Sequence, residues 1–267
     1  MTFTLLLLCF VQGVTEFLPV SSSAHMIMLQ QWIGDIPNHP DLYVGLHLGT
    51  LCAVVTFYIK DIFRLSTRFI VGTLDPKQRK NDDFNLSLCV LIATLPALAL
   101  GFFLKPYLAF IQENFLMIAL SSITFGGILA FVDHYANLDI EDISKRNALF
   151  IGLGQLFAFL PGGSRLGTTI TVARMLGMSR SRAFYFSMLL SVPVVLGACV
   201  LMAIDGYKDN ITFITEQSIT AMLITFLIGL MSLSIMHYCV DRVGYAIFGI
   251  YRIFFGFLIL LWMWAVN

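Results

Sequence analysis

The sequence predicts an all-α polytopic membrane protein with six transmembrane helices and two re-entrant helical hairpins, arranged as two inverted-topology repeats. Of the 267 residues, 58% are hydrophobic and only 12% are charged, whereas soluble domains have about 45–50% and about 25%. The apolar residues form long runs rather than amphipathic stripes, and two of these runs are interrupted by Pro and small residues. We therefore expect lipid to surround most of the chain.

Six apolar stretches are long enough to cross about 30 Å of hydrocarbon at about 1.5 Å per residue. They are 42–59, 86–104, 115–132, 184–204, 219–238 and 245–264. The segment 60–83 is expected to be a cytoplasmic connection. Because the first Lys or Arg is Lys60, the apolar start lacks the basic region of a signal peptide and is expected to belong to the folded protein.

Two other apolar regions, 3–33 and 148–177, are interrupted at their centres by Pro19-Val-Ser-Ser-Ser and Pro161-Gly-Gly-Ser. Pro and Gly end helices, and irregular backbone at membrane depth survives only where protein or a water-filled cavity satisfies its amides. Both regions are therefore predicted to be re-entrant hairpins that enter and leave on one side.

The distribution of charge agrees with this arrangement. If 60–83 is cytoplasmic, 12 of the 16 Lys and Arg residues lie inside, Lys105 and Lys208 lie outside, and Arg165 and Arg252 lie within the bilayer. Both termini are then extracytoplasmic. The net charge of zero gives no basic excess for binding nucleic acid. The five cysteines have no CxxC spacing and lie in apolar stretches, so we expect neither disulfides nor a zinc site.

An internal repeat divides a single domain, residues 1–267, into repeat 1 (1–135) and repeat 2 (147–267). At an offset of 142, Phe17-Leu18-Pro19 aligns with Phe159-Leu160-Pro161; Ser22, Tyr43 and Leu48 align with Ser164, Tyr185 and Leu190. Each half holds one hairpin and three spans, and this odd number inverts the second half relative to the first. Inverted repeats usually place the functional site where their broken helices meet, which here predicts a site at the two Pro-containing breaks.

Polar residues gather at the first break, and ionisable groups inside a membrane are functional candidates. Gln12 and Glu16 are four residues apart and share a helix face, so both can reach one cation. Ser21 and Ser22 lie where the returning helix should begin, and the free amides of a helix start suit an anion. His25, one turn further on, can transfer a proton or act as a nucleophile.

The second break adds Ser164, Arg165 and Thr169, and the guanidinium of Arg165 offers paired donors to phosphate oxygens. Tyr251 and Arg252 in the last span either reach a phosphate or bond to carbonyls of another helix. Together these groups predict a site for a phosphorylated ligand, and its position within lipid predicts a lipid phosphate.

At these residues the chain resembles the undecaprenyl-diphosphate phosphatase family of bacterial inner membranes, also known as bacitracin-resistance proteins. The family's first motif, (Glu/Gln)-Gly-x-Thr-Glu-Phe-Leu-Pro-Val-Ser-Ser-x-x-His, is complete from Gln12 to His25. The second, Pro-Gly-x-Ser-Arg-Ser-Gly-x-Thr, matches from Pro161 to Thr169 except that Leu166 replaces its second Ser. Further matches are Gly177-Met-Ser-Arg180, Phe186-Ser-Met-Leu-Leu-Ser-Val-Pro193 and Ile250-Tyr-Arg252.

The resemblance implies hydrolysis of undecaprenyl diphosphate to undecaprenyl phosphate and phosphate, which recycles the lipid carrier for peptidoglycan synthesis and confers bacitracin resistance. It also implies a homodimer in the inner membrane, a site open to the periplasm, and a requirement for Mg²⁺ or Ca²⁺. Gln12 occupies a position that is often Glu, so metal affinity is expected to be weaker. The family's functional positions fall on Gln12, Glu16, Ser21, Ser22, His25, Ser164, Arg165 and Thr169.

The expected roles combine both lines of reasoning. Glu16, with Gln12, holds the cation, and Arg165 neutralises the phosphates. His25 or Ser22 attacks the terminal phosphorus, or His25 activates a water; we favour His25 as base or nucleophile, with Ser22 orienting the phosphate. Substrate binding is expected from Gln12, Ser21, Ser164, Thr169, Tyr251 and Arg252. The alternative is a lipid-phosphate transporter or flippase, for which inverted repeats and broken helices are equally suitable.

Overall fold

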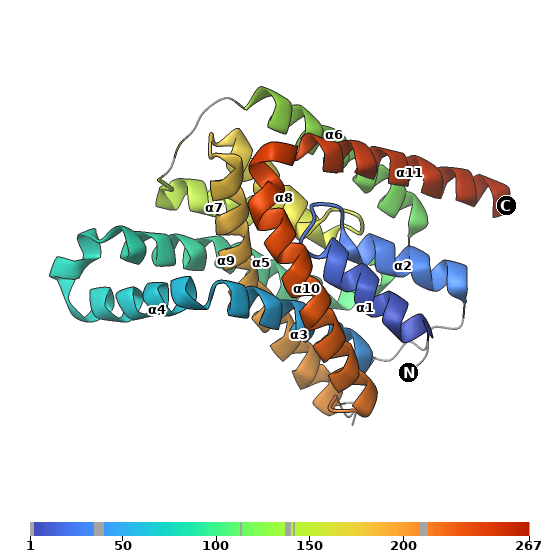
Figure 1. Cartoon of the computed structure of the whole chain (residues 1–267), viewed down its shortest axis with the longest axis horizontal. Helices are drawn as coiled ribbons and strands as arrows, with labels where there is room; N and C mark the ends of the chain where they lie inside the picture. Colours follow the sequence, from blue (N-terminus) through green and yellow to red (C-terminus); the bar gives the residue numbers. More distant parts are fainter. Residues whose placement is uncertain are drawn as a thin grey trace.

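The computed structural model describes residues 3–34, 40–112, 114–136, 140, 142–208 and 213–266. These residues form an all-helical structure, which confirms the predicted fold class (Figure 1). The helices are α1 (Phe3–Thr15), α2 (Ser22–Ile33), α3 (Pro40–Phe57), α4 (Ile59–Leu74), η1 (Pro76–Lys80), α5 (Asp82–Gln112), α6 (Phe115–Tyr135), α7 (Lys145–Gly154), η2 (Gln155–Phe159), α8 (Arg165–Met175), α9 (Arg180–Lys208), α10 (Glu216–Val243) and α11 (Ala246–Val266).

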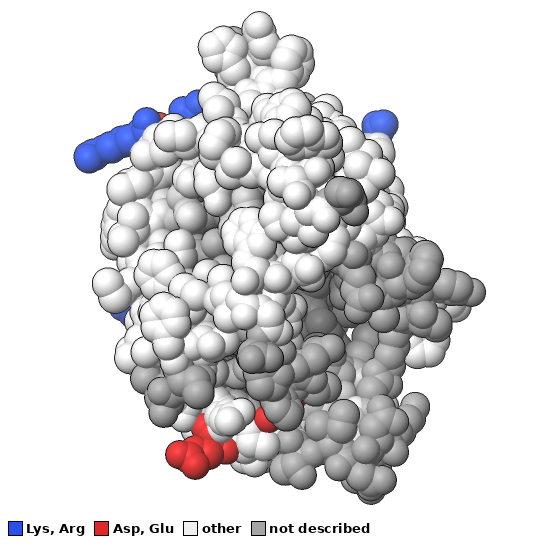
Figure 2. Space-filling model, turned by 90° about the vertical axis from the view of Figure 1, so that its right-hand side faces the viewer, with Lys and Arg blue, Asp and Glu red and all other residues white. Residues whose placement is uncertain are grey.

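Five of the described helices, α5, α6, α9, α10 and α11, are long and apolar enough to cross a membrane. A sixth span exists if α3 and α4, which bend by 78° at their junction, are counted together. Large apolar side chains are exposed along one face of α10, where we expect them to contact lipid; they are Leu223, Leu227, Met231 and Ile235. Figure 2 shows a face on which most described residues are uncharged, with a few Lys and Arg near the upper edge and a few acidic side chains at the lower edge. The chain is a multi-pass membrane protein.

The segment 60–83, which was predicted to be a cytoplasmic connection, is mostly helical in the structure, and its side of the membrane stays a prediction. Its charged residues make α4 too polar to be read as a span, but α4 packs along α5. The rings of Phe69 and Phe84 stack with centroids 6.1 Å apart, and Gly72 leaves room for the Phe84 ring. The α4–α5 pair extends to the left in Figure 1.

Glycines allow two helix pairs to approach closely. A Cβ atom at Gly126 of α6 would lie 2.7 Å from the carbonyl oxygen of Gly249 in α11, and a Cβ atom at Gly249 would lie 2.5 Å from that of Gly126. On α3, Cβ atoms at Gly45 and Gly49 would lie 2.4 Å and 2.6 Å from backbone carbonyl oxygens of α10. In a membrane, where apolar burial drives helix association weakly, such small residues provide the packing contact.

The two hairpins correspond helix by helix. At the offset of 142, α1 falls on α7 and η2, α2 falls on α8, and α3 falls within α9. Helix α1 packs against α10, whereas α7 packs against α5, so each hairpin contacts a long helix of the other half of the chain. The inversion of the second half relative to the first stays a prediction.

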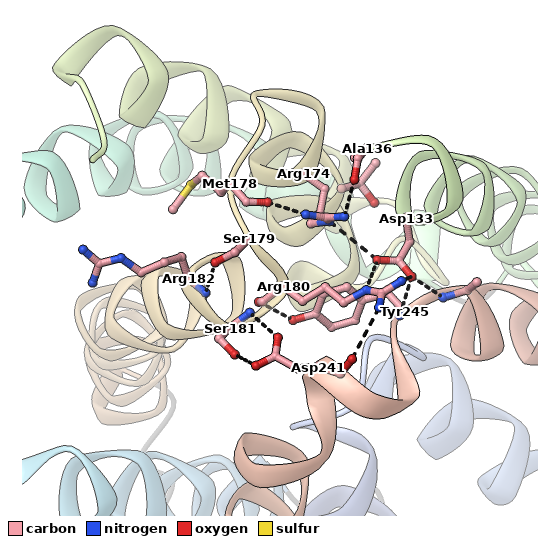
Figure 3. A network of polar contacts seen from close by, with 12 residues as sticks. Asp133, Ala136, Arg174, Met178, Ser179, Arg180, Ser181, Arg182, Asp241 and Tyr245 are labelled. Carbon is pink, nitrogen blue, oxygen red and sulfur yellow. Dashed lines mark hydrogen bonds and ion pairs between the residues drawn. The ribbon is translucent and has the colours of Figure 1, made fainter. Parts of the chain in front are cut away.

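A buried carboxylate joins four helices at the end of α6 (Figure 3). Asp133 accepts two hydrogen bonds of 2.9 Å from the guanidinium of Arg180 and also accepts the backbone amides of Tyr245 and Ala246 at 2.7 Å and 3.1 Å. The Nε of Arg174 lies 3.5 Å from the same carboxylate, and its terminal nitrogens donate to backbone carbonyls of Met178 and Ala136. The network fixes the ends of α6 and α8 and the starts of α9 and α11.

Candidate functional site

The two breaks line one cavity of about 270 Å³. The α1–α2 connection contributes Glu16 and Ser21; Ser164 before α8 and Arg165, the first residue of α8, come from the second break. The predicted meeting of the two breaks is therefore present in the structure. The other residues of the wall are Thr15, Leu18, Ser22, Ser23, His47, Ala97, Gln155, Ala158, Phe159, Leu166, Val194, Val195, Ala198, Cys199 and Met202.

Both returning helices begin at a serine with an unusual backbone conformation. Ser21 has φ of 73° and Ser164 has φ of 63°, and within the described residues they are the non-glycine residues with positive φ. The hydroxyl of Ser21 accepts the amide of Ala24 at 3.4 Å, and that of Ser164 accepts the amide of Gly167 at 3.0 Å. Positive φ at a residue with a side chain is strained and clusters at functional sites.

This geometry changes the correspondence between the breaks. The offset of 142 aligns Ser164 with Ser22, but the residue that shares its conformation and capping role is Ser21. Repeat 2 therefore has one additional residue between its proline and its capping serine. At each helix start the first amides have no acceptor within the helix, and they are available to an anion.

Glu16 contacts polar side chains from both breaks. Its Oε1 accepts the Nη2 of Arg165 at 2.5 Å, although the two residues are 149 positions apart. Its Oε2 accepts the hydroxyl of Ser22 at 2.6 Å and the Nε2 of Gln12 at 3.0 Å. The side chains of Arg165 and Glu16 are 20% and 10% exposed, so the ion pair is poorly hydrated and its mutual attraction is strong.

His47, which lies within the predicted span 42–59, also belongs to the site. It lies on the cavity wall, and its Nδ1 accepts the Nε2 of Gln12 at 3.2 Å. A histidine within a span either bonds to a neighbouring carbonyl or takes part in a site, and only the fold shows that Gln12 lies opposite it.

His25 does not lie on the cavity wall. Its Nδ1 donates to the carbonyl of Ser21 at 2.8 Å, and its Nε2 lies 2.7 Å from the hydroxyl of Tyr251. Its ring stacks on Phe255 with centroids 4.2 Å apart. Because a carbonyl can only accept, Nδ1 carries the proton in the neutral ring, which leaves the lone pair on Nε2. This is the tautomer that a base requires, and the role predicted for His25 stays a prediction.

Arg252 holds the backbone of the second break through hydrogen bonds. It is fully buried, and its Nη2 donates to the carbonyls of Gly162 and Gly163 at 2.7 Å and 2.9 Å. Of the two options that the sequence left open for this residue, the structure shows bonds to backbone carbonyls. Thr169 is also directed elsewhere: its hydroxyl donates to the carbonyl of Arg165 at 2.9 Å within α8, and it does not line the cavity.

Gln155 is a wall residue that our sequence reasoning missed. It is 2% exposed and lies at the end of α7, where η2 begins. An offset of 143, which also aligns Ser21 with Ser164, places it opposite Gln12. The repeat could have identified Gln155, but the constant offset of 142 does not align it with Gln12.

The site offers donors to a phosphorylated ligand, and its one carboxylate could also hold a cation beside that ligand. Within the described residues no group of three or more His, Cys, Asp or Glu side chains is arranged to hold a metal ion. Mg²⁺, however, is commonly held by one or two carboxylates together with substrate phosphates. One carboxylate, one hydroxyl and one carboxamide, from Glu16, Ser22 and Gln12, fit that kind of site, and Arg165 adds a positive charge beside it.

Comparison with known proteins agrees with this geometry. The family model described as bacitracin resistance protein BacA matches residues 5–258. A protein of Alcanivorax borkumensis named undecaprenyl-diphosphatase is 34% identical over 263 residues, which cover 98% of this chain and 98% of that protein. The motifs at both breaks therefore lie within a similarity that spans the whole molecule.

Proposed function

The chain belongs to the bacitracin resistance protein BacA family, and from this premise we propose that it hydrolyses undecaprenyl diphosphate to undecaprenyl phosphate and phosphate. The observation that carries the proposal is the contact of 2.5 Å between Glu16 and Arg165, which brings the polar groups of both breaks into one cavity. The name of the relative favours hydrolysis over transport of a lipid phosphate. The product would return to peptidoglycan synthesis, and its supply would confer bacitracin resistance.

The cavity would bind the diphosphate through positive charge and backbone amides. Arg165 and the first amides of α8 would donate to the phosphate oxygens, and the start of α2 would face them with a second set of amides. During hydrolysis negative charge moves onto the leaving undecaprenyl phosphate. Donors that are already oriented in a poorly hydrated site stabilise this charge more than water does.

His25 would act as the base. Its Nδ1 is fixed by the Ser21 carbonyl, so Nε2 carries the lone pair; the hydroxyl of Tyr251, which donates to Nε2, would have to move away before this nitrogen takes a proton. Glu16 is a weaker candidate, because both of its oxygens already accept hydrogen bonds, from Arg165 at Oε1 and from Ser22 and Gln12 at Oε2. The Ser22 hydroxyl, held by Glu16, would orient the phosphate that a water attacks.

A divalent cation, Mg²⁺ or Ca²⁺, would be held by Glu16 with Gln12. When bound, it would neutralise part of the charge of the diphosphate. The carboxamide at position 12 provides a neutral ligand, and we expect the affinity for the cation to be modest. We further propose a homodimer in the bacterial inner membrane with the cavity open to the periplasm.

The test is phosphate release from undecaprenyl diphosphate by the detergent-purified protein, with Mg²⁺ or with EDTA. Glu16→Ala is expected to lower the rate by at least about 100-fold, because it removes the centre of the site. Glu216→Ala is the matched control, since Glu216 is an exposed Glu at the start of α10. Absence of release by the folded, unaltered protein in Mg²⁺ would overturn the proposed hydrolysis. Equal release in EDTA would overturn the cation requirement.

A further inference from the structure

Gln155 has an unusual environment for a buried carboxamide. Both its Oε1 and its Nε2 are buried and have no hydrogen-bond partner. Several other described side chains also have buried polar atoms without a partner, but Gln155 is the one that lies on the wall of the cavity between the breaks.

The equivalent residue of repeat 1 is paired. Gln12 donates to the carboxylate of Glu16, four residues later in the chain. In repeat 2 the position of Glu16 is apolar at either alignment. It is Phe159, four residues after Gln155, at the offset of 143, and Ala158 at the offset of 142. Repeat 2 therefore has the buried carboxamide but lacks the carboxylate that accepts its hydrogen bond in repeat 1.

A buried polar group without a partner is unfavourable, and native proteins usually pair such groups with protein atoms, water or ligand. The carboxamide of Gln155 offers two N–H donors and no charge. Arg165 and the amide-rich start of α8 border the same cavity, so an anion bound there lies among donors.

We propose that the Nε2 of Gln155 donates a hydrogen bond to a phosphate oxygen of the diphosphate, which makes Gln155 a substrate-binding residue. This inference rests on the proposed function, because it identifies a further contact to the same substrate. The contact holds the ground state and the transition state alike, so its loss raises KM and leaves kcat largely unchanged.

The test compares two variants. Gln155→Met keeps the length of the side chain and removes its hydrogen-bonding groups, whereas Gln155→Glu places a negative charge on the cavity wall. Ser187→Ala is the matched control, since the Ser187 hydroxyl is also buried without a partner but does not line the cavity. For each purified variant, phosphate release gives KM and kcat, and thermal unfolding at increasing undecaprenyl diphosphate gives the concentration at half-maximal stabilisation.

For Gln155→Met we expect KM to rise about tenfold, with kcat within about threefold of the unaltered protein; without ligand the unfolding temperature should be equal or higher, because the variant no longer buries an unpaired carboxamide. Gln155→Glu is expected to raise KM further, and Ser187→Ala to leave it within about twofold. A KM for Gln155→Met within twofold of the unaltered protein would overturn the inference and leave the proposed function standing. If the unaltered protein releases no phosphate, the proposed hydrolysis fails, and the unfolding midpoints still decide whether Gln155 contacts the lipid diphosphate. Equal midpoints for the unaltered protein and Gln155→Met, or no stabilisation of either by the lipid, would also overturn the inference.

Discussion

The hydroxyl of Tyr251 lies 2.7 Å from the Nε2 of His25, and this contact joins the first turn of α2 to the second turn of α11. Since Nδ1 of the neutral ring holds its proton toward Ser21, Tyr251 is the donor in this bond. The tyrosine therefore occupies the lone pair that a base would use.

The role of Tyr251 can be separated from that of His25. We expect His25→Ala to lower phosphate release about 100-fold to 10,000-fold, because general bases contribute this much. Tyr251→Phe frees Nε2 and keeps the ring against Phe255, so activity should stay within about fivefold. Both rates are measured at saturating lipid. A loss above 100-fold in Tyr251→Phe would show instead that its hydroxyl takes part in the proton path.

Arg252 is predicted to stabilise the second break. Arg252→Met leaves the carbonyls of Gly162 and Gly163 without this donor, and each unpaired buried group costs about 1–3 kcal/mol. The variant should melt at a lower temperature and bind the lipid diphosphate more weakly, because the start of α8 loses its support. Arg146→Met, at an exposed arginine of α7, is the control. Equal melting temperatures for the two variants would contradict the assigned role.

The carboxylate of Asp133 is predicted to be a stability residue rather than a site residue. Asp133→Asn removes a charge that Arg180 and the start of α11 share, and breaking a buried pair costs about 3–5 kcal/mol. Denaturant unfolding in detergent measures this loss, while phosphate release per folded molecule should not change. Asp241→Asn is the control: Asp241 is exposed, and its carboxylate accepts hydrogen bonds from Ser181, which contribute about 0.5–1.5 kcal/mol each. A smaller loss for Asp133→Asn than for Asp241→Asn would reject the prediction.

Two adjacent glycines of α6 test the packing against α11. A Cβ atom at Gly126 would lie 2.7 Å from a backbone carbonyl oxygen, whereas one at Gly127 would meet its nearest neighbour at 4.0 Å. Gly126→Ala should therefore destabilise the protein. Gly127→Ala should be neutral or stabilise it by up to about 1 kcal/mol, because Ala favours helix. Thermal unfolding of both variants in one detergent decides this, and the reverse order would mean that α6 and α11 do not pack through Gly126.

The sequence predicted the fold well where a single physical signal dominated. The apolar runs of α5, α6, α9, α10 and α11 located these spans, and Pro19 and Pro161 located the breaks. Helix α4 was missed because its charged residues place it outside any apolar run; its amphipathic periodicity, whose apolar face packs on α5, is the signal that would have located it.

The site was predicted in part. Glu16, Ser22 and Arg165 were identified because an ionisable group in lipid needs a partner, and the structure brings them together. Gln155 was missed because a neutral amide in an apolar run is not conspicuous. That His25 does not line the cavity was also unpredictable, since its position depends on how α2 packs against α11.

The position of Asp133 has a consequence for biosynthesis. Its carboxylate is on α6, whereas its donors come from α9 and from the start of α11, more than 110 residues later in one case. A nascent chain is made from the N-terminus, so α6 leaves the ribosome before any of these donors exists. Asp133 therefore lacks its last two donors until the start of α11 has been synthesised. Truncation before residue 245 should leave the carboxylate with Arg174 and Arg180 alone and the end of α6 less firmly held.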